Sequence, residues 1–453
     1  MFASLRRLAV TVSLVSACLV TALVTSSAAA TPRTAASPIL TLSHTCSASS
    51  AEVDQAVDPL HGDVYEAWIG CAQEGIAFVR STNGGATFSA PVILQGSVDV
   101  FSWDPAATVG PDGTLYVSFM VKVGDQSYPI VDISHDHGAT FSTVTRLVPK
   151  QHGNWGDRDF VAAGPSGTVY VTWDYGPSAS KVHFLCPPAG SCSFSTGDLN
   201  IVVQKSTDGG KHFGPMVHVS PGYPAGGADI GRIDVTPAGR VDVVFQALAV
   251  TNKTTDALGP GHLFFTSSKD GGASWSKPVE LGPKAGSVSV HTWWIDGDLA
   301  VDAGGTLYAS WDTQGKAGDV GWLTWSSDGG THWSAARRVV KVPEKDALIV
   351  QVTGGTAGHA DVGWLGDQSP KGYELWVRPF TTGAGGTWLG PATLASGSVD
   401  GRSTVWPGDT FGLSAVPPAG SSAQHQLDVG WGSSVSHTSA ARDDIFATRL
   451  SLP

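Results

Sequence analysis

A short motif that recurs along the chain constrains the fold more than any other feature of the sequence. It reads Ser-x-Asp-x-Gly-x-x-aromatic, and its copies follow one another at intervals of about 50 to 70 residues. In such a turn the carboxylate can accept hydrogen bonds from backbone amides, and the glycines allow a positive φ. The copies lie at residues 81–88 (with Asn83 in place of Asp), 134–141, 206–213, 268–275 and 327–333, with a degenerate copy at 381–388.

A second repeated element is a turn followed by an alternating strand that ends in an aromatic residue. Its seven copies lie at residues 62–68, 113–119, 167–173, 239–245, 305–311, 359–364 and 426–431. A short apolar run precedes each copy, and a third strand, a turn and an outer strand follow most of them. Seven such units predict an all-β protein, a seven-bladed β-propeller with four-stranded antiparallel blades.

The two ends of the chain complement each other. The seventh unit stops after its third strand, at residues 445–450, and therefore lacks an outer strand. Residues 37–43 resemble residues 89–94, which form the predicted outer strand of the first unit. We expect this N-terminal strand to complete the seventh blade, because closing the ring removes an exposed sheet edge.

Composition excludes several classes of protein. The formal net charge is −12 and no basic run occurs, which argues against a nucleic-acid partner. Apolar residues make up 42% of the chain, too many for a disordered protein. Beyond the first 30 residues, no apolar segment reaches the roughly 20 residues needed to span a bilayer. A globular protein remains, and we expect it to be a monomer.

The first 30 residues resemble a secretory signal peptide. Arg6 and Arg7 precede an apolar run over residues 8–24, and small residues at 28–30 offer a cleavage site. Residues 31–453 would then form a single secreted, extracellular propeller domain. Residues 15–18 also fit a lipobox, so anchoring as a lipoprotein through Cys18 is the alternative.

Four cysteines remain after this leader, an even number that suggests disulfide bonds in an oxidising compartment. Cys186 and Cys192 lie close together in a segment rich in Pro, Gly and Ser, so a local bridge is the simplest pairing. That pairing leaves Cys46 to bond with Cys71. The spacing of the four cysteines does not match that of a metal site.

The recurrent turns resemble the Asp boxes of the sialidase superfamily of BNR-repeat proteins, across nearly the whole mature chain. In that family the boxes lie between the third and fourth strands, on the face opposite the active site. The resemblance therefore implies a structural role for Asp136, Asp208, Asp270 and Asp328. It leaves function open, because Asp boxes also occur in lectins, other sugar hydrolases and non-catalytic scaffolds.

The opposite face, around one mouth of the central tunnel, carries the candidate site. Five Trp residues that belong to no repeat position fall just before inner strands, where they could stack on sugars or cap the strands. Two of the segments that lead into inner strands share the pattern His-x-x-Trp-x-Asp-x-Asp. This pattern could serve acid–base catalysis, hold Ca²⁺ or be architectural. The pattern comprises His152, Trp155, Asp157 and Asp159 in the third unit and His291, Trp294, Asp296 and Asp298 in the fifth; the other Trp are Trp103, Trp293 and Trp406. No cofactor other than Ca²⁺ is expected, and the long loop at 174–200 on the same face is a candidate binding loop.

Sialidases hold the substrate carboxylate with three arginines, and the resemblance assigns that role to Arg158, Arg232 and Arg402. The chain departs from the family in three ways: it lacks the Arg-Ile-Pro motif, it has no Tyr after Tyr373, and it has seven units rather than six. Three hypotheses follow. The protein is a secreted glycoside hydrolase, or a lyase on acidic sugars; a glycan- or protein-binding propeller; or a scaffold.

Overall fold

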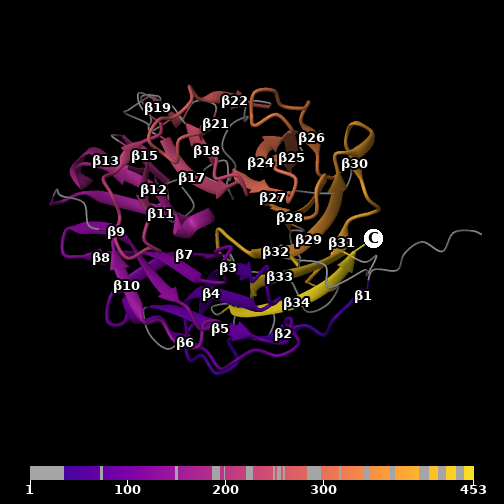
Figure 1. Ribbon diagram of the computed structural model, residues 1–453, viewed down its shortest axis with the longest axis horizontal. Coiled ribbons are helices and arrows are strands. Elements are labelled where there is room, and N and C mark those ends of the chain that lie inside the picture. The colour runs from indigo at the N-terminus through magenta and orange to yellow at the C-terminus, as the bar shows by residue number, and fades with distance from the viewer. Residues whose placement is uncertain are drawn as a thin grey trace, which may run out of the picture. The chain divides into compact units, whose positions relative to one another are not determined.

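Seven antiparallel sheets surround a central axis, as the repeats predict (Figure 1). The computed structural model describes residues 35–71, 75–147, 152–185, 194–197, 199–220, 228–247, 250–252, 257–258, 261–282, 297–315, 318–340, 347–367, 373–396, 408–416, 425–434 and 443–452. These belong to one compact unit, Thr34–Pro453. The prediction of a signal peptide lies outside the described residues.

Each blade runs from an inner strand at the axis to a short outer strand. The first three blades contain β3 (Ser50–Val57), β4 (Val64–Gly70), β5 (Ile76–Ser81) and β6 (Val92–Ile93); β7 (Phe101–Val109), β8 (Leu115–Val123), β9 (Gln126–Ser134) and β10 (Thr143–Arg146); and β11 (Trp155–Ala163), β12 (Val169–Gly176), β15 (Asn200–Ser206) and β16 (Val217–His218). The next three contain β17 (Ala228–Val235), β18 (Val241–Ala247), β21 (His262–Ser268) and β22 (Val279–Leu281); β23 (Asp298–Val301), β24 (Leu307–Gly315), β25 (Gly318–Ser326) and β26 (Arg337–Arg338); and β27 (Leu348–Gly354), β28 (His359–Asp367), β29 (Tyr373–Thr381), β30 (Thr387–Trp388) and β31 (Thr393–Leu394).

The seventh blade confirms the predicted closure. It contains β32 (Gly412–Val416), β33 (His425–Ser433) and β34 (Asp444–Leu452), and the N-terminal strands β1 (Ala35–Ala36) and β2 (Leu40–Thr41) both pair with β34. Leu40 pairs with Ala447, and the Ser43 hydroxyl donates to Asp444 Oδ1 at 2.9 Å. The outer strand of this blade therefore comes from the opposite end of the chain.

The remaining elements are small. Two hairpins stand apart from the blades, β13 (Val182–Leu185) with β14 (Phe194–Gly197), and β19 (Val250–Asn252) with β20 (Ala257–Leu258). The first hairpin lies within the long loop noted in the sequence. Four 3-10 turns complete the described elements: η1 (Gln95–Ser97), η2 (Pro165–Gly167), η3 (Ala179–Lys181) and η4 (Gly383–Gly385).

The aromatic residues that end the alternating strands form the core. All seven are buried, with exposures of 0–2%, because the strand alternation directs them between blades. They are Trp68, Phe119, Trp173, Phe245, Trp311, Trp364 and Trp431. Burial of large rings at the same place in every blade makes each blade depend on its neighbours.

The repeated turns lie between the third and fourth strands, where the resemblance places them. In blade two the Ser134 hydroxyl donates to Asp136 Oδ1 at 2.8 Å, and the same oxygen accepts the Thr140 amide at 2.8 Å. The other four well-formed boxes repeat this pattern within 0.2 Å of these distances. In blade five the serine that bonds Asp328 is Ser326 rather than Ser327, so this copy starts one residue earlier than expected.

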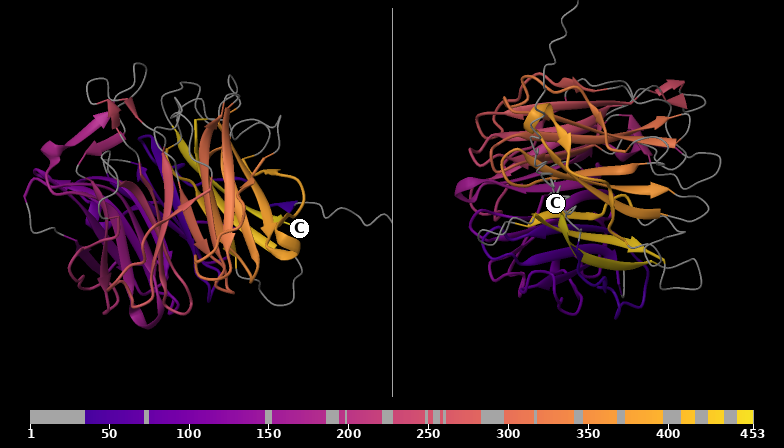
Figure 2. Two further views of the ribbon diagram at one scale, coloured as in Figure 1. Left: turned by 90° about the horizontal axis from the view of Figure 1, so that it is seen from above. Right: turned by 90° about the vertical axis from the view of Figure 1, so that its right-hand side faces the viewer.

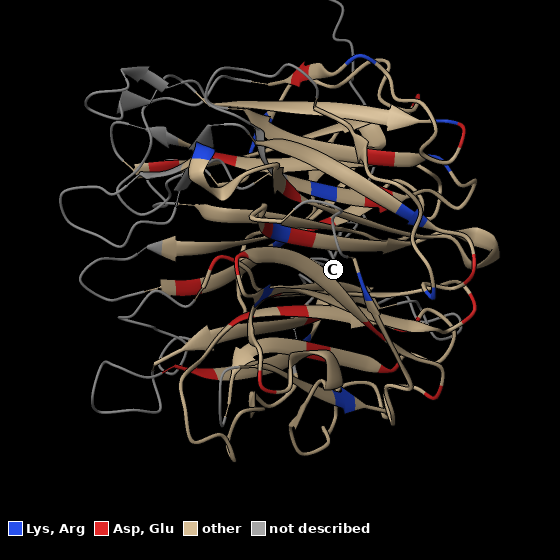
Figure 3. Ribbon diagram, turned by 90° about the vertical axis from the view of Figure 1, so that its left-hand side faces the viewer, with Lys and Arg blue, Asp and Glu red and all other residues tan. Residues whose placement is uncertain are grey.

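The strands run between two ends of the propeller (Figure 2). The boxes and the turns that join first to second strands lie at one end, and the starts of the inner strands lie at the other. In the side view of Figure 3, acidic residues lie along strands as well as at turns, and basic residues are scattered among them. A disulfide bond joins Cys46 and Cys71, which confirms that pairing. Cys186 and Cys192 lie outside the described residues.

Candidate functional site at the tunnel mouth

The inner strands of all seven blades line a central cavity of about 450 Å³. Each strand contributes the residues that follow its entry into the tunnel, and the first of these differ widely in chemistry. They are Asp54, Ala106, Phe160, Arg232, Asp298, Gln351 and Leu413, in the order of the blades. The cavity therefore combines carboxylates, a guanidinium, an amide and apolar walls, a mixture typical of ligand pockets.

A β-bulge at the start of several inner strands sets which side chains reach the mouth. Between Ala51 and Asp54 the inner strand has one residue more than the second strand with which it pairs. The inner strands of blades two, three and six have an extra residue at the same point. The residue inside each bulge has a left-handed backbone conformation: Glu52 (φ 55°), Asp104 (φ 51°), Arg158 (φ 51°) and Ile349 (φ 48°). This conformation costs about 1–3 kcal/mol for a residue with a side chain, and bulges are known to redirect side chains beside functional sites.

Three of the bulge residues meet Asp409 from blade seven at the mouth. Arg158 Nη2 lies 2.5 Å from Asp409 Oδ2, and the Arg158 amide donates to Asp104 Oδ2 at 3.1 Å. Glu52 packs against the backbone of Gly408, next to Asp409. Only glycine allows this contact, because a Cβ at position 408 would lie 2.4 Å from Cγ of Glu52 and the residue has φ +107°. Three carboxyl groups thus lie around Arg158, of which Asp409 pairs with its guanidinium and Asp104 accepts its backbone amide.

The crowding changes the acidity of Glu52. Burial raises the pKa of Glu52 well above its usual range, and the neighbouring charges of Asp104 and Asp409 raise it further, against a smaller opposing effect of Arg158. A hydrogen bond to Asp104 also favours the protonated Glu52 carboxyl. Two carboxyl groups can share such a bond only when one of them carries a proton, and the raised pKa of Glu52 favours Glu52 as that carboxyl.

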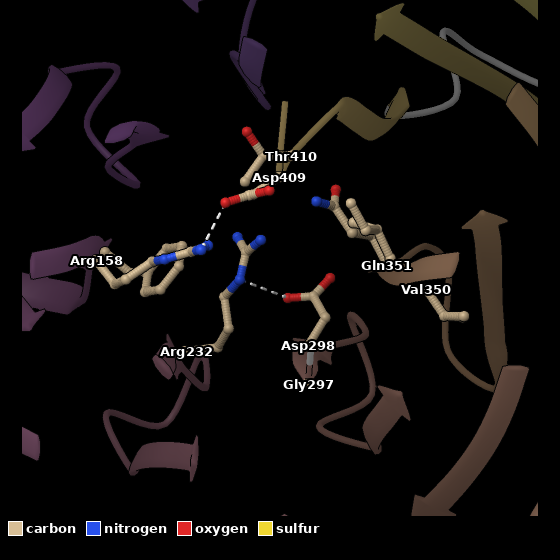
Figure 4. A pocket seen from close by; sticks show the side chains of 10 residues that line it. Arg158, Arg232, Gly297, Asp298, Val350, Gln351, Asp409 and Thr410 are labelled. Carbon is tan, nitrogen blue, oxygen red and sulfur yellow. Dashed lines mark hydrogen bonds and ion pairs between the residues drawn. The ribbon is translucent and has the colours of Figure 1, made fainter. Parts of the chain in front are cut away.

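A second layer lies deeper in the tunnel, around Arg232. Its guanidinium stacks on the Phe160 ring, 4.0 Å from the centroid, and Nε lies 3.6 Å from Asp298 Oδ1. Burial raises the pKa of Asp54 to about 6, although Arg232 acts in the opposite direction. Figure 4 shows the Arg158 and Arg232 side chains entering one small cavity, which Asp298, Gln351 and Asp409 also line.

Several tunnel carboxylates connect neighbouring blades. Asp54 accepts the Ala107 amide of the next inner strand at 2.7 Å. Asp234 and Asp298 accept the amides of Val301 and Val352 in the same way, each at 2.8 Å. These bonds replace the backbone ladder that adjacent inner strands lack, so these three residues have a structural role whatever else they do.

The structure brings together two of the three predicted arginines. Arg158 and Arg232 line the same small cavity, whereas Arg402 lies outside the described residues. Each of the two already faces a carboxylate of the chain, Asp409 or Asp298. A clamp for a substrate carboxylate would therefore have to displace these partners.

The third-unit motif divides between surface and interior. His152 is exposed and Trp155 is partly buried. Asp157 Oδ1 accepts the Trp103 indole N–H at 2.6 Å, a bond that ties blade two to blade three. Asp159 is fully buried, and this burial raises its pKa well above the usual range. Of the fifth-unit motif only Asp298 is described; His291, Trp294 and Asp296, like Trp293 and Trp406, lie outside the described residues.

Sequence analysis did not single out Glu52, Asp104 or Asp409 as site residues. A signal was present in the first three units, where a charged residue stands two places before the first tunnel-lining residue: Glu52, Asp104 and Arg158. The bulge that aims these side chains cannot be read from the alternation of polar and apolar residues. Their meeting with Asp409 depends on closure of the ring.

Comparisons with known proteins support the fold. No protein-family model matches the sequence, and no curated protein matches it significantly. A protein of unknown function from Dyadobacter fermentans is similar in structure, with 15% identity over 93% of this chain and 100% of that one and a TM-score of 0.52. An ulvan lyase of a new polysaccharide lyase family, bound to -[GlcA(1-4)Rha3S]-, has 10% identity over 90% and 95% of the two chains and a TM-score of 0.54. The Hadza microbial sialidase Hz136 has 13% identity over 83% and 74%, with a TM-score of 0.48.

These likenesses identify the architecture. The all-β, seven-bladed propeller with four-stranded antiparallel blades is confirmed by the sheet topology, and the ulvan lyase is similar to it in fold. Within the described part of the chain, no helix combines the length and apolar character that crossing a membrane requires.

Proposed function

We propose that the protein is an exported, monomeric propeller that acts on carbohydrate and hydrolyses glycosidic bonds at the tunnel mouth. The observation that carries the proposal is the meeting of Glu52, Asp104 and Asp409 around Arg158, where burial and the neighbouring charges raise the pKa of Glu52. Glycoside hydrolysis needs a protonated carboxyl that gives its proton to the leaving oxygen and a second carboxylate near the sugar. The mouth supplies both groups, and the central cavity of about 450 Å³ lies deeper in the tunnel, lined from Asp54 and Arg232 inward.

In the proposed reaction Glu52 transfers its proton to the glycosidic oxygen as the bond to the anomeric carbon breaks. Asp409, held by Arg158 beside Glu52, is the carboxylate that stabilises the positive charge developing on the sugar ring. Water adds to the anomeric carbon and gives up a proton, which restores Glu52. Because Arg158 and Arg232 already face carboxylates, this site favours a neutral sugar over an acidic one.

Three further features support the proposal. The Cys46–Cys71 bond accords with an oxidising, extracellular compartment, as the predicted leader does. The ulvan lyase, which binds a saccharide, shares the fold over 90% of this chain. The Phe160 ring beside Arg232 gives the cavity an apolar wall.

A screen of the purified mature protein against reporter glycosides, followed by a glycan array, tests the proposal. For the substrate found, Glu52→Gln should lower kcat by about 100-fold or more, because general acid catalysis contributes 10²–10⁴-fold. Glu280→Gln is the matched control, because Glu280 lies on the outer strand β22, partly exposed. Full activity of Glu52→Gln would refute the role of this residue, and the absence of both hydrolysis and glycan binding would refute the proposed function.

A non-catalytic glycan-binding propeller is the second candidate. The carboxylates of Asp54, Asp234 and Asp298 all bond backbone amides of neighbouring blades, as they would in a tunnel built only to hold the ring together. Glycan binding without hydrolysis, unaffected by Glu52→Gln, would favour this alternative.

A further inference from the structure

A cluster of imidazoles and carboxylates lies at the end of the propeller opposite the mouth, where blade one meets blade two. In the part of the chain that the structure describes, it is the one group of three or more His, Cys, Asp and Glu residues whose ligand atoms all lie within 4.8 Å of one another. Asp58 and His61 belong to the turn between β3 and β4, and His137 belongs to the Asp box of blade two. Asp63 lies beside them.

The turn that carries Asp58 and His61 departs from the repeat. In blades two to six a backbone hydrogen bond closes this turn between residues four positions apart, for example from the Gly110 amide to the Thr114 carbonyl. In blade one it spans five, from the Asp58 amide to the Asp63 carbonyl. The longer turn contains His61.

The box that carries His137 departs from the repeat as well. The position before the second glycine of each box has a left-handed backbone, and four boxes place glycine there: Gly84 (φ 67°), Gly209 (φ 73°), Gly271 (φ 69°) and Gly329 (φ 76°). Blade two places His137 there with φ 58°, a conformation that disfavours any residue with a side chain. Strain of this kind clusters at functional sites, although Ala384 adopts φ 54° at the same place in the degenerate copy of blade six.

The side chains introduced by these two departures converge. Asp58 Oδ2 lies 2.8 Å from His61 Nδ1 and 3.7 Å from His137 Nδ1, and the two rings meet edge to face at 4.6 Å. His137 Nδ1 is buried and has no hydrogen-bond partner of good geometry among the described residues, although Asp63 Oδ2 lies 3.0 Å away. The Asp58 side chain is fully buried, whereas the imidazoles are 52% and 42% exposed, so an ion could reach the cluster from solvent.

We propose that Asp58 Oδ2, His61 Nδ1 and His137 Nδ1 bind a divalent transition-metal ion such as Zn²⁺. Ligands of a tetrahedral zinc ion at about 2.0–2.1 Å stand about 3.3 Å apart, and the two oxygen–nitrogen separations of 2.8 and 3.7 Å lie on either side of this value. Two imidazoles with a carboxylate suit Zn²⁺, whereas Ca²⁺ and Mg²⁺ prefer oxygen ligands. The buried carboxylate of Asp63 adds negative charge beside the ion.

The metal would join two blades. His137 comes from blade two and the other ligands come from blade one, so binding should stabilise the contact between them. This inference is independent of the chemistry proposed at the mouth.

The test is calorimetric titration of the full mature protein, stripped with chelator, with ZnCl₂ and separately with CaCl₂, together with thermal unfolding. The wild type should bind one Zn²⁺ at this site and melt at a higher temperature with Zn²⁺. His137→Gly is the informative variant, because it removes a ligand and restores the residue that the other boxes use. It should fold normally without metal, bind Zn²⁺ at least about 100-fold more weakly and lose the thermal shift.

Two controls make the result decisive. His61→Ala removes the second imidazole and should weaken binding similarly. His332→Ala removes an exposed imidazole in the Asp box of blade five, which among the described residues bonds Asp328 of the same box, and should leave Zn²⁺ binding unchanged. Equal Zn²⁺ affinity in wild type and His137→Gly, or binding of Ca²⁺ in preference to Zn²⁺, would overturn the proposal.

Discussion

Removal of the Cys46–Cys71 bond tests how strongly the closure of the ring is fixed. The bond spans 25 residues, and it ties the segment that follows the closing strand β2 to the end of β4. Closing a loop of this size removes about 12 cal/mol/K of entropy from the unfolded chain, or about 3.5 kcal/mol at 25 °C. A domain of about 420 residues unfolds with about 0.9 kcal/mol/K of entropy, so Tm should fall by about 4 °C.

The assay is thermal unfolding of the Cys46→Ala/Cys71→Ala variant, followed by tryptophan fluorescence with and without reductant. Alanine is the suitable replacement because both cysteines are buried, at 5% and 7% exposure, and a serine would bury a hydroxyl. With reductant, the Tm of the wild type should approach that of the variant. Any change that reductant causes in the Tm of the variant would report the predicted Cys186–Cys192 bond. A variant that melts within about 1 °C of the wild type would refute the entropic argument.

Two other predictions concern individual carboxyl groups. Burial raises the pKa of Asp234 to about 7, so the folded protein keeps a proton that the unfolded chain loses near pH 4, and stability falls as pH rises between these values. Asp234→Asn cannot titrate, and its Tm relative to wild type should rise by about 3 °C between pH 5 and pH 8; a constant difference would contradict this. In the Asp box of blade four, Asp270→Ala removes the acceptor for Ser268 and Ser274 and should lower Tm by about 1–3 °C. Asp270→Asn should lower Tm by less than Asp270→Ala, because Asn83 makes the same hydrogen bonds in blade one. An equal fall in Tm for both variants would count against this account of the box.

The fold could be predicted because its determinants are local and repeated. An alternating strand that ends in a Trp specifies a buried ring whichever blade it belongs to, as Trp68 and Trp431 show at opposite ends of the chain. The closure and the Cys46–Cys71 pairing followed from the incomplete seventh unit and the even number of cysteines. These inferences needed no knowledge of side-chain direction.

The candidate site could not be predicted to the same degree, because it depends on register and on contacts between distant segments. A bulge of one residue decides whether Glu52 or Val53 points toward the mouth, and no alternation pattern reveals it. Asp157, a candidate catalytic residue in the sequence, accepts the Trp103 indole N–H, a contact that the sequence did not predict. Arg158 and Arg232 do meet, but each also faces a carboxylate that their sequence neighbours gave no reason to expect.

Comparison among the blades separates what the fold requires from what it merely tolerates. The bulge is part of the architecture, because blade six forms it with Ile349, a buried apolar residue in the same left-handed conformation. The backbone therefore does not need a charge at this position. Blades one to three nevertheless place Glu52, Asp104 and Arg158 there, where they crowd against Asp409 at a cost in desolvation. The bulge alone therefore does not account for these charges, although they also join blades, because Arg158 bonds Asp104 of blade two and Asp409 of blade seven.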